Sequence, residues 1–300
     1  MDKICIFGVG LIGGSLALAL KERSFCKQIV GCSRNEAHLK RAQELGAIDS
    51  WTLDPRAAAK DADLIFLATP VGAIKAVLSS IREFVGDQTI ITDGGSCKKS
   101  VVDAAVEVFG TLPERFVPGH PIAGREKSGV DYADAKLYVD HKVILTPVES
   151  TDPAAVTIVT GMWETCGANV QLLGVEQHDQ VLAATSHLPH VLAYALVETV
   201  AKTTWIGQIF EFAAGGFRDS SRVASSDPTM WRDICHYNRD AILEMTSLYR
   251  EKLESLEKLI EAGDSEGLFE LFARAKETRD ERFGYSDYHW MRLRSSDSLC

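Results

Sequence analysis

The sequence predicts an α/β protein with a doubly wound, mainly parallel sheet, followed by an all-helical region. Up to about residue 173, short β-branched runs alternate with helical stretches. From residue 176 onward the strand signals stop and long helical periodicity takes over. A chain of 300 residues is long enough for two domains with separate cores. We expect these domains to cover residues 1–174 and 175–290, with a polar, basic and disordered tail over 291–300.

The predicted strands are short apolar segments that end in polar or glycine-containing loops. They cover residues 3–7, 28–32, 63–70, 88–93 and 115–118, and segments 142–146 and 169–173 are expected to complete the sheet. Helices are predicted between them, for example over 73–85 and 153–164. Ligands of such sheets bind at the carboxyl ends of the strands, so the residues that follow each strand are the candidates for chemistry.

The first strand runs directly into a glycine-rich turn, Gly8-Val9-Gly10-Leu11-Ile12-Gly13, and then into a helical segment. Glycines at this spacing allow a tight turn, a close approach to a pyrophosphate and close packing of a helix on a sheet. We therefore predict a Rossmann-type dinucleotide-binding domain, with Gly8, Gly10, Leu11, Ile12 and Gly13 at the cofactor. A glycine-rich turn that binds nothing is the alternative, and the second strand, which follows at the right distance, argues against it.

The residues after the second strand, Ser33 and Arg34, indicate which dinucleotide binds. An acidic residue about 20 positions after the glycines would bond the ribose 2′-hydroxyl of NAD. Arginine beside a small hydroxyl residue suits a 2′-phosphate instead. The sequence therefore predicts NADP as the cofactor, with NAD as the second choice.

Charge and composition restrict the partners. The net charge of −10 makes nucleic acid and anionic membranes poor partners, and an anionic substrate would need a local basic cluster. The first 23 residues contain no signal-peptide cleavage pattern, which predicts a cytoplasmic location. Seven cysteines without a CxxC pair indicate neither a disulfide framework nor a metal site.

The helical region carries more apolar surface than a small bundle needs. Asp227-Pro228 predicts a helix start, and Asp264 or Ser265 can cap a further helix after Gly263. Apolar residues recur at intervals of three and four on both sides of that glycine: Ile242, Met245, Tyr249, Leu253, Leu256, Ile260, Leu268, Leu271 and Phe272. We predict a homodimer built on this all-α region.

Four segments hold residues that packing does not require: 93–98, 119–129, 186–190 and the glycine-rich, basic segment 215–222. His120 lies between a strand end and glycines, on the edge where a nicotinamide would bind, and a purely structural histidine is the alternative. Pro189 removes one backbone N–H and kinks its helix, which can turn Ser186 and His190 toward a common site. A merely bent helix is the alternative for that pair.

Five motifs stand in one order along residues 3 to 283: GVGLIGGS, the Ala68-Thr69-Pro70 triplet, GHPIAG with EKSG behind it, SHLPH, and GGFRDSSR followed by SDPTMW. Together they resemble the prephenate and arogenate dehydrogenase family of tyrosine biosynthesis. The resemblance implies an oxidative decarboxylation, in which a hydride leaves the carbinol carbon of prephenate for NAD(P)+ and the ring carboxylate leaves as CO2. The implied product is 4-hydroxyphenylpyruvate from prephenate, or L-tyrosine from L-arogenate.

The resemblance also implies roles for individual residues. His120 would accept a hydrogen bond from the ring hydroxyl, and Ser96 would orient this histidine and the nicotinamide. Arg222 would bind a substrate carboxylate through its planar guanidinium. The other implied residues are His190, Ser186, Glu126 and Gly215 around the substrate, and Thr69 and Pro70 at the cofactor.

Two other functions stay open. A β-hydroxyacid dehydrogenase shares the domain order, but its catalytic lysine with an asparagine four residues later has no counterpart near 177–185. A non-catalytic dinucleotide-binding regulator would have no reason to keep Ser96, His120 and Arg222 together. The substrate stays open too, because His190 and segment 126–128 resemble prephenate enzymes, whereas Ser33-Arg34 and segment 217–222 also resemble arogenate enzymes that use NADP.

Overall fold

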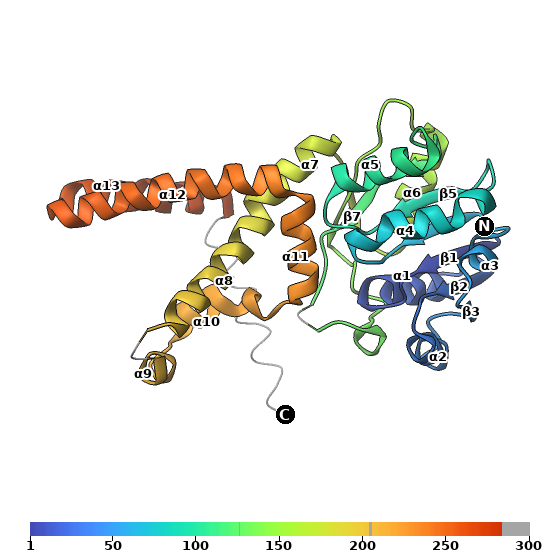
Figure 1. The fold of residues 1–300 in the computed structure, drawn as a ribbon, viewed down its shortest axis with the longest axis horizontal. Coiled ribbons are helices and arrows are strands. Elements are labelled where there is room, and N and C mark those ends of the chain that lie inside the picture. The colour runs from blue at the N-terminus through green and yellow to red at the C-terminus, as the bar shows by residue number, and fades with distance from the viewer. Residues whose placement is uncertain (126, 204–205, 284–300) are drawn as a thin grey trace. The chain divides into compact units, whose positions relative to one another are not determined.

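The computed structural model describes residues 1–125, 127–203 and 206–283. The chain divides into two compact units, Met1–Leu243 and a second one that starts at Glu244. The division falls inside helix α12 (Arg239–Ala262), and Figure 1 labels helices of both units. The tail predicted over 291–300 lies outside the described residues.

A six-stranded sheet forms the centre of the first unit, and its neighbouring strands all run parallel. The order is β3 (Ser50–Thr52), β2 (Gln28–Cys32), β1 (Lys3–Phe7), β4 (Leu64–Leu67), β5 (Ile90–Asp93) and β6 (Phe116–Val117). The connecting helices are α1 (Leu11–Glu22), α2 (Glu36–Glu44), α3 (Pro55–Ala59), α4 (Val71–Ile81) with the short turn η1 (Arg82–Phe84), and α5 (Lys98–Phe109) (Figure 1). The strand order reverses direction at β1 and β4, and ligands of such sheets bind at this point. The predicted Rossmann-type fold is confirmed.

Alternate side chains of the central strands fill two cores, one on each face of the sheet. Ile4 and Ile6 of β1 pack in one cluster with Trp163, whereas Cys5 and Phe7 belong to the other. Successive side chains of a strand point to opposite faces, so a strand covered on both sides must be apolar throughout. This requirement explains the continuous apolar runs in the sequence.

A separate three-stranded sheet follows, made of β7 (Gly119–Pro121), β8 (Lys142–Leu145) and β9 (Asn169–Leu172). Strand β7 is antiparallel to β8, and β8 is parallel to β9. The prediction that 142–146 and 169–173 complete the main sheet is therefore wrong. The main sheet ends at Val117 because Pro118 has no N–H to continue the ladder, and the chain passes into the second sheet at Gly119. The turn η2 (Val130–Tyr132) and helix α6 (Pro153–Thr165) lie in the segments between these strands.

A helical segment completes the first unit. It contains α7 (Val175–Leu182), the π-helical turn η3 (Ala183–His187), α8 (Leu188–Ala201), α9 (Ile206–Glu211), α10 (Gly215–Ser221), η4 (Arg222–Ser225) and α11 (Pro228–Tyr237). The predicted helix start is confirmed, because the Asp227 side chain accepts a hydrogen bond from the Met230 N–H, 2.8 Å away. Pro189 lies in the first turn of α8, directly after the π turn, so the predicted irregularity is present there. None of the helices in the described part of the chain is long and apolar enough to cross a membrane.

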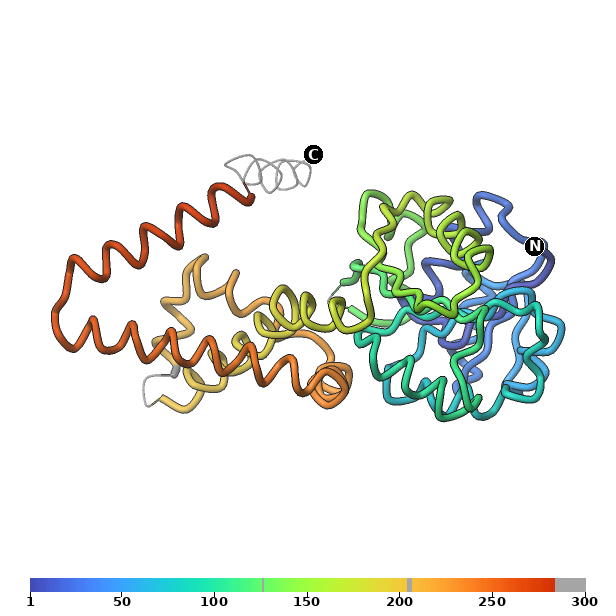
Figure 2. Tube along the Cα trace, turned by 90° about the horizontal axis from the view of Figure 1, so that it is seen from above, coloured from blue at the N-terminus to red at the C-terminus, as the bar shows by residue number. Residues whose placement is uncertain are grey.

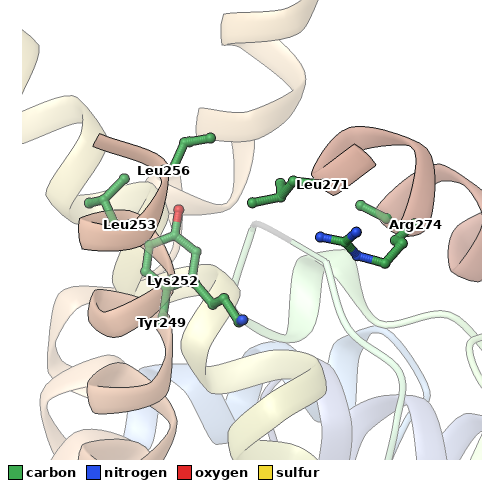
Figure 3. A pocket seen from close by; sticks show the side chains of 7 residues that line it. Tyr249, Lys252, Leu253, Leu256, Leu271 and Arg274 are labelled. Carbon is green, nitrogen blue, oxygen red and sulfur yellow. The ribbon is translucent and has the colours of Figure 1, made fainter. Parts of the chain in front are cut away.

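The second unit contains the rest of α12 and α13 (Ser265–Phe283), joined at Gly263, which has a φ of +63° (Figure 2). Its apolar side chains are largely exposed: Phe269 is 68% exposed, and no side chain of α13 is buried within the described chain. A hollow of about 360 Å³ lies between the two helices, lined by Tyr249, Lys252, Leu253, Leu256, Leu271, Arg274 and Ala275 (Figure 3). A helix pair of this kind lacks a core of its own and exposes an apolar face.

Candidate active site

The glycine turn after β1 has the geometry that a dinucleotide needs. Gly8 has a φ of +91°, and a Cβ there would lie 2.6 Å from the Ala68 carbonyl oxygen. A Cβ at Gly13 would lie 2.2 Å from the Gly8 carbonyl oxygen, so both positions require glycine. The space beside Gly10 is open, and no side chain caps the start of α1. The first N–H groups of α1 are therefore available for a pyrophosphate, and these residues fit a bound dinucleotide.

The end of β2 lies beside this turn, because the Gly8 N–H donates to the Cys32 carbonyl oxygen over 2.9 Å. Ser33 and Arg34 follow, and the Ser33 hydroxyl accepts a hydrogen bond from the Asn35 N–H, 3.1 Å away. Asn35 in turn caps α2 through its side chain. Arg34 is thus an exposed side chain on a short, well-anchored turn next to the glycines. On the β4 side, the hydroxyl of Thr69 is buried without a hydrogen-bond partner in the described chain.

His120 lies in the middle of β7, between Gly119 and Pro121, where it pairs with Ile144 of β8. Burial lowers the pKa of His120 well below the ordinary 6.5, and His178, Lys98 and His187 nearby lower it further. The imidazole is therefore neutral at neutral pH. A neutral imidazole has one ring nitrogen that can accept a proton or a hydrogen bond.

A buried ion pair supports the strand that carries His120. Lys98 and Asp93 are both 0% exposed, and the Lys98 ammonium donates to the Asp93 carboxylate and to the Gly119 carbonyl oxygen. The other Asp93 oxygen accepts the Gly119 N–H over 3.0 Å. Both backbone groups of Gly119 are thus bound, which fixes the residue directly before His120. The sequence analysis did not assign Lys98, although a lysine within the segment after β5 was the available signal.

A second histidine contacts His120. Nδ1 of His120 lies 2.9 Å from Nε2 of His178, and Nδ1 of His178 lies 2.8 Å from Oδ1 of Asp179. The sequence analysis missed both residues. A histidine followed by an aspartate near the start of a helix was the only signal, and only the fold brings α7 to β7.

The residues predicted around the substrate lie on the next helices of the same unit. The His190 ring stacks on Trp231 at 3.7 Å between centroids and 19° between planes. Nδ1 of His190 donates to the Ser186 carbonyl oxygen over 2.8 Å, which leaves Nε2 as its acceptor. Burial lowers the pKa of His190, and the charge of Arg222 lowers it further, so Arg222 lies near this ring. Gly215 is the exposed first residue of α10, the helix that ends just before Arg222.

Two models of protein domains match the chain. Residues 16–172 match the nucleotide-binding domain of prephenate dehydrogenase, and residues 175–274 match its dimerization domain. The chain belongs to the prephenate dehydrogenase family. It is therefore a nicotinamide-dinucleotide-dependent oxidoreductase, which confirms the family predicted from the motifs.

Relatives of this family are similar over nearly the whole chain. The prephenate dehydrogenase of Bacillus subtilis is 38% identical over 283 residues, which are 93% of this chain and 76% of the relative. The cyclohexadienyl dehydrogenase of Zymomonas mobilis is 37% identical, over 92% of this chain and 94% of the relative. The structure of prephenate dehydrogenase from Aquifex aeolicus with hydroxyphenyl propionate and NAD+ has a TM-score of 0.87 and 36% identity, over 94% of this chain and 98% of that one. Synechocystis arogenate dehydrogenase has a TM-score of 0.79 and 31% identity, over 93% of this chain and 99% of that one.

Ser96 and Glu126 are two further residues that the resemblance to this family implies. Ser96 lies in the loop between β5 and α5 and is partly exposed, but the hydrogen bond of His120 within the described chain runs to His178. Glu126 lies outside the described residues. The role of each stays a prediction.

Proposed function

We propose that this chain catalyses the oxidative decarboxylation of prephenate, L-arogenate or both in tyrosine biosynthesis, and that NADP is its preferred cofactor. The observation that carries the proposal is the neutral, partly buried His120 in β7, the edge strand of the small sheet, in the same unit as a β1 turn that fits a dinucleotide. Relatives at 37% and 38% identity are named cyclohexadienyl and prephenate dehydrogenase, which supports this substrate class.

The reaction needs an acceptor that shares the hydroxyl proton while the hydride leaves, and it releases no net proton. The carbinol hydrogen leaves as a hydride for the nicotinamide, which the bound cofactor supplies. The ring carboxylate leaves as CO2, and the electron pair of the broken carbon–carbon bond completes the aromatic ring. The hydroxyl proton ends on the phenol product, so His120 shares this proton only while the carbinol carbon is electron-poor.

Other side chains bind and orient the substrate in this proposal. Arg222 binds a carboxylate, and a guanidinium suits that task because it donates two parallel hydrogen bonds. His190, which stacks on Trp231, and Ser186, whose carbonyl oxygen it bonds, would contact the substrate. Ser96 would orient the nicotinamide, Gly215 would border the substrate, and Glu126 would act on the substrate side chain.

The preference for NADP rests on the end of β2. Arg34 is exposed beside the glycine turn, and neither Ser33 nor Arg34 offers a carboxylate to a ribose 2′-hydroxyl. A 2′-phosphate would gain a charge-assisted bond from Arg34 and a hydroxyl neighbour in Ser33. Thr69 and Pro70 would border the cofactor from β4.

We also propose a homodimer built on the helical domain over 175–290, with 1–174 as the cofactor domain. The exposed apolar side chains of α12 and α13 support it, because apolar side chains that gather on a surface mark an interaction site. A dimeric mass by light scattering at micromolar concentration is the expected result, and a monomeric mass would contradict it. A cytoplasmic location stays a prediction of the sequence, which cell fractionation tests.

One experiment tests the activity and both preferences. Initial rates are measured for prephenate and L-arogenate, each with NADP and with NAD. We expect reduced cofactor to form with at least one substrate, faster with NADP than with NAD. No reduction in any of the four combinations would support the regulator instead, and equal rates with both cofactors would contradict the preference for NADP.

A further inference from the structure

Three side chains form a continuous hydrogen-bonded chain behind the proposed proton acceptor. His120 of β7 contacts His178 of α7 at 2.9 Å, and His178 contacts Asp179 at 2.8 Å. His178 is 0% exposed and Asp179 is 6% exposed, so both residues are buried. The neighbours of Asp179 decide which way the protons in this chain point.

The Asp179 carboxylate can only accept hydrogen bonds. Oδ1 accepts the Lys98 N–H over 2.8 Å, and Oδ2 accepts the Lys99 N–H over 3.0 Å, at the start of α5. The start of a helix also favours a negative charge. Burial alone would raise the pKa of Asp179, but the hydrogen bonds from His178, Lys98 and Lys99 outweigh burial and lower it. Asp179 is therefore an anion, and the nitrogen that faces it must carry a hydrogen.

This requirement determines the tautomer of both histidines. Nδ1 of His178 donates to Asp179, and burial lowers the pKa of His178, so the ring is neutral and its Nε2 holds a lone pair. That lone pair accepts the hydrogen on Nδ1 of His120. The lone pair of His120 is consequently on Nε2, which has no hydrogen-bond partner within residues 1–125, 127–203 and 206–283.

We propose that His178 and Asp179 are positioning residues, which hold His120 in the tautomer that accepts the substrate hydroxyl proton on Nε2. The proposal rests on the proposed function of His120. As positive charge develops on His120, its Nδ1–H becomes a stronger donor, and His178, fixed by an anion, stabilises that charge. Neither His178 nor Asp179 touches the reacting atoms.

A purely structural role is the competing explanation. The same hydrogen bonds tie α7 to β7 and α5, so losing them would destabilise the fold without affecting the chemistry of the molecules that stay folded. The two roles differ in three measurable quantities: the tautomer of His120, kcat per folded molecule and rescue by a residue that keeps the acceptor.

The first test reads the tautomer directly. Nitrogen-15 NMR of histidine-labelled wild type distinguishes protonated from unprotonated ring nitrogens, and the signals that vanish in His120→Asn assign this residue. We expect Nδ1 of His120 to be protonated and Nε2 unprotonated in the wild type at pH 7.5. A hydrogen on Nε2 instead would overturn the proposal, whatever the enzyme's activity.

The second test compares three variants at equal folded concentration. Gln at 178 keeps a carbonyl oxygen near the place of Nε2, whereas Leu keeps volume and removes the acceptor. We expect His178→Leu to lower kcat by about 10²-fold with KM within about threefold, because a misplaced acceptor slows chemistry more than binding. His178→Gln should recover at least half of that loss on a logarithmic scale. His141→Leu is the matched control, because it removes an exposed histidine directly before β8.

The outcomes separate the two proposals. Wild-type kcat in His178→Leu, or equal losses in the Leu and Gln variants, would overturn the positioning role while leaving the dehydrogenase intact. Absence of turnover by the wild type would overturn the proposed function. The tautomer of His120, read by NMR, would still show whether His178 and Asp179 position this ring. If His178→Leu does not fold, the Gln variant and the wild-type spectrum carry the test.

Discussion

The glycine turn after β1 and the histidine cluster around β7, made of His120, His178 and Asp179, are two sites in one unit. They are built from different chemical groups. The turn uses backbone groups from one short segment, Gly8 to Gly13, and its geometry follows from the absence of side chains. The cluster uses groups from β7, α7 and α5, and the hydrogen bonds between these elements join residues 21 to 81 positions apart along the chain. The turn carries no group that titrates near neutral pH, whereas the function of the cluster depends on which nitrogen holds a proton. A change in the turn should therefore affect cofactor binding, and a change in the cluster should affect rate and pH dependence.

The largest difference between the effects of a substitution on kcat and on KM is expected at His120. His120→Asn should lower kcat by about 10²–10⁴-fold with a smaller effect on KM, because the lost acceptor acts while the hydride leaves. Steady-state kinetics with saturating cofactor measure this effect. If the variant keeps the kcat of the wild type, the histidine is structural and the catalytic assignment is wrong.

A substitution at Arg222 should have the opposite effect, on KM for the substrate more than on kcat. Its guanidinium would hold a carboxylate in both the ground state and the transition state, so Arg222→Ala should mainly raise the KM for the substrate. The expected loss is about 2–4 kcal/mol of charge-assisted binding. The KM for the cofactor, measured in the same series, is the internal control. A variant that loses kcat and keeps its KM would show that the arginine acts on the chemistry instead.

The cluster should also make stability depend on pH. His187 is 1% exposed, accepts a hydrogen bond from the Asn238 amide on Nδ1, and burial lowers its pKa to about 4. In the unfolded chain His187 binds a proton near pH 6.5, whereas in the folded chain it stays unprotonated until about pH 4. The free energy of unfolding is therefore highest above pH 6.5 and falls as the pH drops toward 4. The loss is on the order of 3 kcal/mol for this group. Urea unfolding of wild type and His187→Gln between pH 7 and 4.5 measures the difference, and parallel curves would contradict it.

The smallest effect is expected at the cofactor end. Arg34→Ala should cost about tenfold or more in kcat/KM for NADP while sparing NAD, because one charge-assisted contact is worth about 1.5–3 kcal/mol. Arg56→Ala, an exposed arginine at the start of α3, is the matched control. Equal losses with both cofactors would show that Arg34 does not contact a 2′-phosphate.

The same contrast explains what could be predicted from the sequence. The β1 turn and the central strands could be predicted, because glycine spacing and apolar runs are local signals. Strand β3 has only three residues, too few for a periodic pattern, and the second sheet arises where Pro118 ends the ladder. His120 was found because it follows a strand and matches a family motif. The sequence did not indicate His178, Asp179 and Lys98, because their partners are set by tertiary packing. Neither the spacing of residues nor the composition carries information on that packing.

The central claim is that burial and the neighbouring positive and histidine side chains keep His120 neutral and ready to accept a proton. The pH dependence of kcat/KM tests it most directly, because this ratio reports ionisations of the free enzyme. The neutral form is active and the pKa of His120 is lowered, so kcat/KM should rise with pH through one ionisation well below 6.5 and stay level above it. That rising limb should vanish in His120→Asn. A limb at or above pH 6.5 in the wild type, or the same limb in the variant, would contradict the account.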